Sequence, residues 1–62
     1  MSQQSDRIDV DRAAFGMIRA YREKAEIECL AMIDRWEKRG DTHAAELWRS
    51  VLKVVRRELT RG

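Results

Sequence analysis

Apolar residues recur along the first two thirds of the chain at alternating spacings of three and four. At about 100° per residue, such spacing keeps side chains on one narrow face of an α-helix. The members of this apolar stripe are Ala14, Ile18, Tyr21, Ala25, Cys29, Met32 and Trp36. Charged residues such as Glu23 and Asp34 fall on the opposite face. The pattern predicts one long amphipathic helix over about residues 11–39.

The last third of the chain repeats the pattern on a shorter segment. Its apolar residues share one helical face and are Ala44, Trp48, Val51, Leu52, Val55 and Leu59. Cations that point away from this face, called the basic stripe below, are Arg49, Lys53, Arg56 and Arg57. A second helix is therefore predicted over about residues 42–61.

Between the two predicted helices, Arg39-Gly40-Asp41 matches a tripeptide that some extracellular proteins use as an adhesion signal. The same residues suit a tight turn. Gly40 can adopt the left-handed conformation that often follows a helix, and Asp41 or Thr42 can cap the next one. Because a stop signal, a glycine and a cap follow in that order, we interpret Gly40 and Asp41 as a turn at about residues 40–41.

Two features of these boundaries stay open. Asp6, Asp9 and Asp11 are each suitable caps for the first helix, and residues 1–5 are expected to form a flexible tail. The alternative to a hairpin is a single continuous helix through Gly40-Asp41-Thr42, which the weak helix propensity of these residues disfavours.

The size of the chain bears on its assembly. With 62 residues, one cysteine and one histidine, it forms a single small domain without an internal disulfide or a good zinc ligand set. Domains of this size commonly gain stability by oligomerising. We predict an all-α, antiparallel two-helix hairpin over residues 1–62 that dimerises into a four-helix bundle, without cofactor or metal. The relative direction of the hairpins and a higher oligomer stay open.

The two predicted helices differ in length, at about 43 Å and about 29 Å. Folded back from the turn, the second helix reaches only to about residue 20 of the first. Apolar residues beyond that point need another cover, which the second subunit of a two-fold dimer can supply. The predicted dimer interface consists of Phe15, Met17, Ile18, Tyr21 and Ala25.

Single residues that could carry chemistry or recognition mostly have a structural explanation. His43 has no nucleophile or carboxylate placed by the sequence to make it a base. Cys29 lies in the centre of the apolar stripe, as a buried core thiol does. Trp36 and Trp48 flank the turn and are expected to approach each other, as a core plug or alternatively as a recognition cleft. We expect the protein not to be an enzyme.

No segment suits export or a membrane. The first ten residues are polar and lack the apolar core of a signal peptide. The longest apolar run, residues 29–33, falls far short of the roughly 20 residues that span a bilayer. We therefore expect a reducing cytoplasm, and a net charge of +2 argues for no particular partner.

The basic stripe can contact phosphates of a nucleic acid or an acidic protein partner. It lacks the interleaved aromatic residues on which bases stack and any recognisable nucleic-acid motif. An outward helix face is most often simply solvated. We rank solvation first, with the two kinds of partner as alternatives.

The segment "RGDTHAAELWRSVLKVVRREL", residues 39–59, resembles the pattern G-D-x-x-x-A-x-x-W-R followed by an apolar helix, seen in short bacterial proteins of unknown function. This resemblance implies a bacterial helical hairpin and transfers no active residue. In length and architecture the chain also resembles the Rop-type plasmid copy-number regulators, which are RNA-binding homodimers of helical hairpins forming four-helix bundles. The segment "HAAELWRS" is similar to part of their second helix but here follows the turn directly, so no RNA-contacting residue is carried over.

These expectations combine into one hypothesis on function. We predict a small non-enzymatic interaction or regulatory module that acts as a homodimer through protein–protein contacts, with a further protein partner left open. The alternative is a nucleic-acid-binding regulator that uses the basic stripe. No contact with a membrane is expected.

Overall fold

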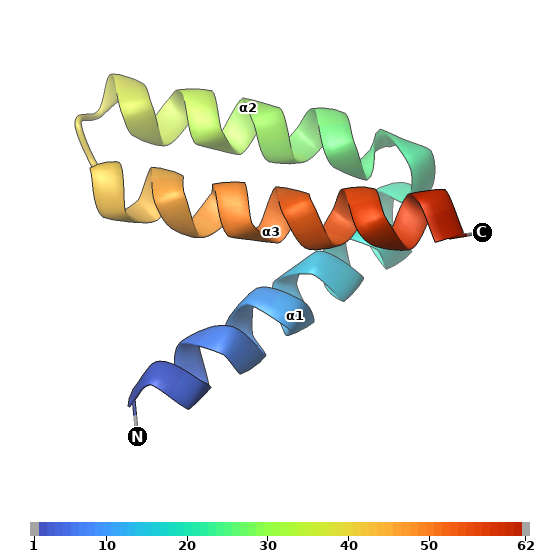
Figure 1. Cartoon of the computed structure of the whole chain (residues 1–62). Helices are drawn as coiled ribbons and strands as arrows, with labels where there is room; N and C mark the ends of the chain where they lie inside the picture. Colours follow the sequence, from blue (N-terminus) through green and yellow to red (C-terminus); the bar gives the residue numbers. More distant parts are fainter. Residues whose placement is uncertain (1, 62) are drawn as a thin grey trace.

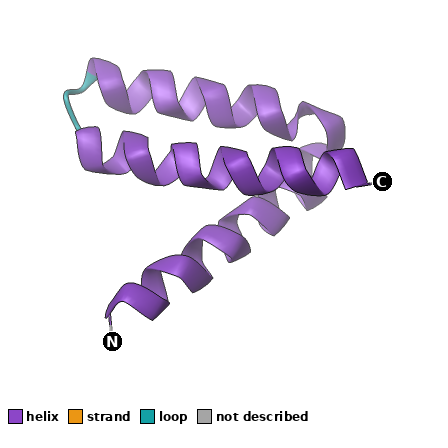
Figure 2. Ribbon diagram, in the orientation of Figure 1, coloured by secondary structure: helices purple, strands orange, loops and turns teal. Residues whose placement is uncertain are grey.

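The computed structural model describes residues 2–61, and the side chains of residues 9–61. Within this range the backbone is helical apart from one turn and contains no strand (Figures 1 and 2). The elements in chain order are α1 (Ser2–Tyr21), a 3₁₀ turn η1 (Arg22–Lys24), α2 (Ala25–Lys38) and α3 (Thr42–Arg61). The predicted all-α class is confirmed, as is the helical hairpin, which α2 and α3 form.

The prediction of one uninterrupted helix over residues 11–39 is wrong, because the chain bends between α1 and α2. Arg22 has a φ of 55°, in the left-handed region that ends a right-handed helix. Tyr21 before it is the last residue of α1 and has a φ of −119° and a ψ of −9°. No glycine or proline marks this position. The strain in the Arg22 backbone is offset by the packing that the bend permits.

The start of α1 also differs from the expectation. The helix begins at Ser2, so residues 2–5 are helical in backbone, whereas a flexible tail was expected over residues 1–5. Met1 lies outside the described residues. Asp6, Asp9 and Asp11 all lie within α1 rather than at its cap.

The central element of the fold is α3, since both α1 and α2 pack against it. The two helices of the hairpin run antiparallel side by side, and α1 crosses them obliquely (Figure 1). α1 also contacts α2, over a smaller surface. The molecule is flat, with extents of 33 × 30 × 16 Å. A large share of each helix therefore faces solvent.

The interior is built from small and medium-sized side chains. Its buried residues are Ala14, Ala25, Cys29, Ile33, Ala45, Val51, Leu52 and Val55. Larger members of the predicted stripes, such as Met32, Trp36 and Trp48, are only half-buried. Because burial free energy scales with the apolar area removed from water, an interior of this kind contributes modestly to stability.

The bend changes what covers the first part of the predicted stripe. Ala25 is 0% exposed within the chain, so assigning it to a dimer interface is wrong. Met17 and Ile18 pack, partly buried, against the chain's own core. The expected overhang does not form, because α1 turns at η1 and packs against α3. Phe15 and Tyr21 stay exposed, and a dimer contact through them stays a prediction.

The turn between α2 and α3 has the predicted chemistry. Gly40 is left-handed, with a φ of 80°. The N–H groups of Gly40 and Asp41 donate to the carbonyls of Glu37 and Trp36, each at 3.0 Å, which is the bond pair of a Schellman motif. Asp41 Oδ1 accepts a hydrogen bond from the Ala44 N–H at 3.0 Å and so caps α3. Closure of the hairpin accounts for the Arg-Gly-Asp tripeptide.

Candidate interaction surface

The cations of the basic stripe do not share one environment. Arg56 Nε lies 2.8 Å from Glu26 Oε2, and Arg49 donates a hydrogen bond to Glu37. Both carboxylates belong to α2, so these ion pairs join the two helices of the hairpin. Exposed pairs of this kind contribute little to stability. They do lower the positive charge that Arg49 and Arg56 can offer to a phosphate.

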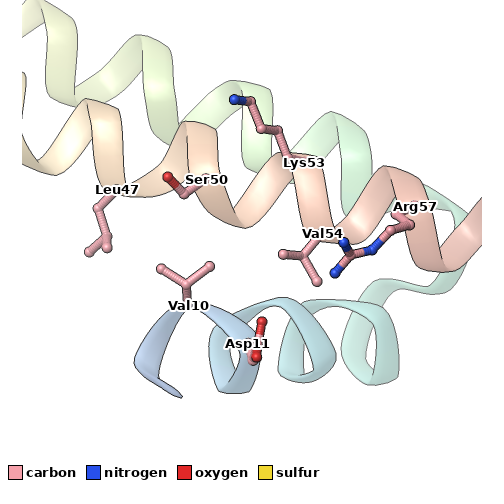
Figure 3. A pocket seen from close by; sticks show the side chains of 7 residues that line it. All are labelled: Val10, Asp11, Leu47, Ser50, Lys53, Val54 and Arg57. Carbon is pink, nitrogen blue, oxygen red and sulfur yellow. The ribbon is translucent and has the colours of Figure 1, made fainter. Parts of the chain in front are cut away.

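The remaining cations of the stripe, Lys53 and Arg57, border a groove between α3 and α1 (Figure 3). The groove has a volume of about 640 Å³. Its lining residues are Val10 and Asp11 of α1 and Leu47, Ser50, Lys53, Val54 and Arg57 of α3. Among the described side chains, neither Lys53 nor Arg57 takes part in an ion pair.

The groove combines an apolar floor with polar walls. Val10 projects from α1 between Leu47 and Val54 of α3, while Asp11 lies on the α1 wall (Figure 3). Leu47 keeps 39% of its surface exposed in this position. A smaller hollow of about 200 Å³ extends the groove past Leu47 toward the start of α3. The further residues that line this hollow are Asp9, His43 and Glu46.

Along α3, the charge on this surface changes sign. Glu46 stands near the start of the helix, with Asp9 of α1 beside the same hollow. Lys53 and Arg57 stand nearer its end. Ser50 lies between the two groups, and its hydroxyl donates to the Glu46 carbonyl at 3.3 Å. The change of sign holds for the α3 side of the surface alone, because Asp11 of α1 adds a negative charge to the groove beside Lys53 and Arg57.

Several exposed apolar residues escaped the sequence analysis. Ile27 is 65% and Leu30 45% exposed, on the side of α2 opposite the buried Ala25 and Cys29. Ile27 and Leu30 are three residues apart and lie outside the main apolar stripe, which is a signal of a second apolar surface on this helix. The sequence analysis missed that signal because it described this face by its charged residues alone. Val10 was a second signal, because it extends the apolar stripe by one turn toward the N-terminus.

The two tryptophans lie near the closed end of the hairpin, and both are half-buried. Trp48 packs against the core. The Arg39 guanidinium lies 5.4 Å from the Trp36 ring centroid, a cation–π distance. The buried Trp36 Nε1 has no hydrogen-bond partner among the described atoms. The packing of Trp48 favours the core explanation for that residue. A recognition role for Trp36 and direct contact between the two rings stay untested.

Cys29 and His43 have the surroundings expected from their positions. Cys29 is 0% exposed, and burial, followed by the charges of Glu26 and Glu28, raises the pKa of its thiol. An enclosed and protonated thiol is a poor nucleophile. His43 is exposed in the first turn of α3. Among the described side chains, no three His, Cys, Asp or Glu residues gather as metal ligands do.

Two wider comparisons complete the description of this surface. Over residues 2–61, no helix is both long enough and apolar enough to cross a bilayer. No protein-family model, curated protein or solved structure matches this chain. The resemblances to short bacterial hairpins and to Rop-type regulators therefore stay hypotheses.

Proposed function

We propose that this chain is a small non-enzymatic interaction module that acts as a homodimer through protein–protein contacts. The observation that carries the proposal is the apolar surface left outside a core of small residues. Large apolar side chains that keep between 39% and 65% of their surface exposed are Phe15, Tyr21, Ile27, Leu30 and Leu47. Covering such side chains with another protein surface is favourable, because apolar area leaves water.

The groove between α1 and α3 supports the same proposal. An amphipathic helix commonly binds by laying its apolar face into a groove between two helices. The floor of this groove, Val10, Leu47 and Val54, is apolar, and its rim is charged. A reducing cytoplasm is the proposed location, where the buried thiol of Cys29 stays reduced without a disulfide partner.

A nucleic-acid-binding regulator is the less favoured function. Arg49 and Arg56 already pair with carboxylates of α2. Of the basic stripe, Lys53 and Arg57 remain, and two cations on this face support few phosphate contacts, each worth roughly one unit of salt slope. An acidic protein partner would meet the same limit. Self-association requires no further component, and we therefore place it first.

Sedimentation equilibrium tests the proposal on the full chain from about 1 to about 100 μM. We expect a dimer mass in the upper part of that range. The melting temperature measured by circular dichroism should rise with protein concentration, because mass action couples folding to assembly. A folded monomer with a concentration-independent melting temperature at every concentration would refute the homodimer.

A titration with duplex DNA and with structured RNA at two salt concentrations tests the less favoured function. The proposal predicts no binding in the low-micromolar range at moderate salt. Tight binding that weakens steeply as salt rises would instead assign the free cations of α3 to phosphate contacts. Lys53→Gln would then reduce the salt slope by about one unit.

A further inference from the structure

The bend between α1 and α2 is not favoured by its own residues. Arg22 is left-handed, with a φ of 55°, and this conformation is strained in any residue that carries a Cβ. No side-chain hydrogen bond caps a helix at Tyr21, before η1, or at Lys24, before α2. All three residues of η1 are exposed, so burial of the bend itself does not hold it. The conformation of η1 therefore depends on the packing of α1 against the hairpin.

The sequence around the bend fits a straight helix. The apolar stripe keeps its helical spacing of three and four through Ile18, Tyr21 and Ala25. Arg19 and Glu23 are four residues apart and would be neighbours of opposite charge on a continuous helix. In the bent chain neither of them forms an ion pair among the described side chains. Joining α1 and α2 into one helix would relieve the strain in η1 and allow that pair to form.

In an isolated chain, straightening would uncover the core. Ala14 is buried, and the partly buried residues of α1 pack against the same core. Val10 of α1 lies between Leu47 and Val54 of α3 (Figure 3). Moving α1 away would expose the apolar surfaces of both helices to water, which is unfavourable. A second copy that has opened in the same way carries the matching surface.

We infer that the homodimer forms by exchange of α1 between two copies. In each copy α1 and α2 join into one straight helix, and α1 packs against the hairpin of the other copy. Exchange of an identical element keeps the contacts of the closed chain, and a short strained hinge favours it. Both chains are also relieved of the strain at Arg22. Because association costs the two chains their independent motion, the closed chain prevails in dilute solution and the dimer at high concentration.

The directions of the helices permit this exchange. In the closed chain α1 runs obliquely back along the hairpin, roughly opposite in direction to α2 (Figure 1). Two straight helices related by a two-fold axis near the bend would likewise run in roughly opposite directions and cross there. Each α1 then meets the other hairpin in the direction that the closed chain shows. Tyr21, 43% exposed in the closed chain, comes to lie near its own copy at the axis and is covered there.

This inference rests on the proposed homodimer and assigns its contacts, so the first experiment asks whether α1 packs within one chain or between two. Val10→Cys and Leu47→Cys, combined in a Cys29→Ala background, place thiols on α1 and α3 at neighbouring positions of the groove (Figure 3). The variant is unfolded, refolded at a concentration where the wild type sediments as a dimer, mildly oxidised and run on a denaturing gel without reductant. We expect a disulfide-linked dimer, because the two thiols of each contact belong to different chains.

Two controls complete this experiment. Each single-cysteine variant should link far more slowly, because the two copies of Val10, like the two copies of Leu47, lie far from each other in the exchanged dimer. A disulfide within one chain, in a variant that still sediments as a dimer, would refute the exchange while the homodimer stands. A wild type that stays monomeric at every concentration would refute both.

A substitution at the bend tests the same inference without cross-linking. Arg22→Gly relieves the strain of the closed chain and lowers the helix propensity of the straight form. It should dimerise at least about tenfold more weakly than the wild type by sedimentation equilibrium. Ala20→Gly is the matched control, because this exposed residue is helical in the closed chain and stays helical in the straight one. It should dimerise as the wild type does. Equal dimerisation of the wild type and Arg22→Gly would overturn the exchange.

Discussion

Two turns connect the three helices, and they solve the same problem in different ways. Between α2 and α3, Gly40 supplies the left-handed residue with a φ of 80°, and the following Asp41 caps the next helix. Between α1 and α2, Arg22 takes the left-handed conformation with a φ of 55°, and no side-chain cap follows. The first turn of the chain lacks every local signal that the second turn carries.

The difference shows where each turn gets its stability. The turn at Gly40 is favoured by its own residues, since glycine has no Cβ to strain the left-handed conformation. The turn at Arg22 costs about 1–2 kcal/mol for the side chain that it places there. Packing of α1 against α3 must offset that cost. Ala14 of α1 is fully buried, at 0% exposed, and so contributes to this packing.

The largest expected effect is therefore a charge at Ala14. Ala14→Asp should destabilise the protein by about 3 kcal/mol or more, because the bend buries this position and the carboxylate would have no partner. Urea unfolding followed by circular dichroism measures the loss. Ala20→Asp, at an exposed site on the same helix, is the control and should cost only about 0.7 kcal/mol from lower helix propensity. Equal costs would mean that α1 continues straight into α2.

A Cβ at the locally favoured turn should have a smaller effect. Gly40→Ala should destabilise by about 1 kcal/mol, because a left-handed alanine is strained. A Cβ built at this position would meet nothing within 4 Å, so no steric clash adds to that cost. Thermal unfolding measures it. An unchanged or raised melting temperature would show that Gly40 is not left-handed.

Removing the cap tests the second local signal of the same turn. Asp41→Ala should cost about 1 kcal/mol or slightly less, because the Ala44 N–H loses its acceptor at an exposed site. Asp41→Asn keeps an acceptor and should recover most of the stability. If the asparagine variant is as unstable as the alanine variant, the hydrogen bond to Ala44 is not the source of the effect.

The smallest effect has the opposite sign and makes the comparison sharpest. Arg22→Gly should stabilise the protein by roughly 0.5 kcal/mol, because relief of left-handed strain exceeds the extra chain entropy of glycine. Glycine would thus raise stability at residue 22, while losing glycine lowers it at residue 40. A loss of stability in Arg22→Gly would mean that the Arg22 side chain makes a contact worth more than the strain.

The hairpin was predictable because its signals are local. Gly40 and Asp41 indicate the turn, and the periodic apolar residues predict α2 and α3 on either side of it. The bend at Arg22 was not predictable in this way, since its cause is contact between α1 and α3, about 40 residues apart in the chain. A continuous apolar stripe across residues 14–36 is compatible with both a straight helix and a bent one.

Prediction of the surface from the sequence meets the same limit, because contacts between distant segments are not visible in local patterns. Helical periodicity placed the basic stripe on the outside of α3, and its residues are indeed exposed. It did not reveal that Arg56 pairs with Glu26, because that contact depends on how two helices align. Nor did it reveal the groove, which exists only because α1 folds against α3 and brings Val10 beside Leu47.

The central position of α3 has a consequence for how the chain is made. Both earlier helices pack against α3, yet α3 is the last of the three to leave the ribosome. Until then α1 and α2 lack their main partner, and isolated helices of this length are only marginally stable in water. We expect α1 and α2 to stay largely unfolded in the nascent chain until α3 has emerged. A premature stop within α3 would remove core residues such as Val51 and Val55 and leave α1 and α2 open to proteases.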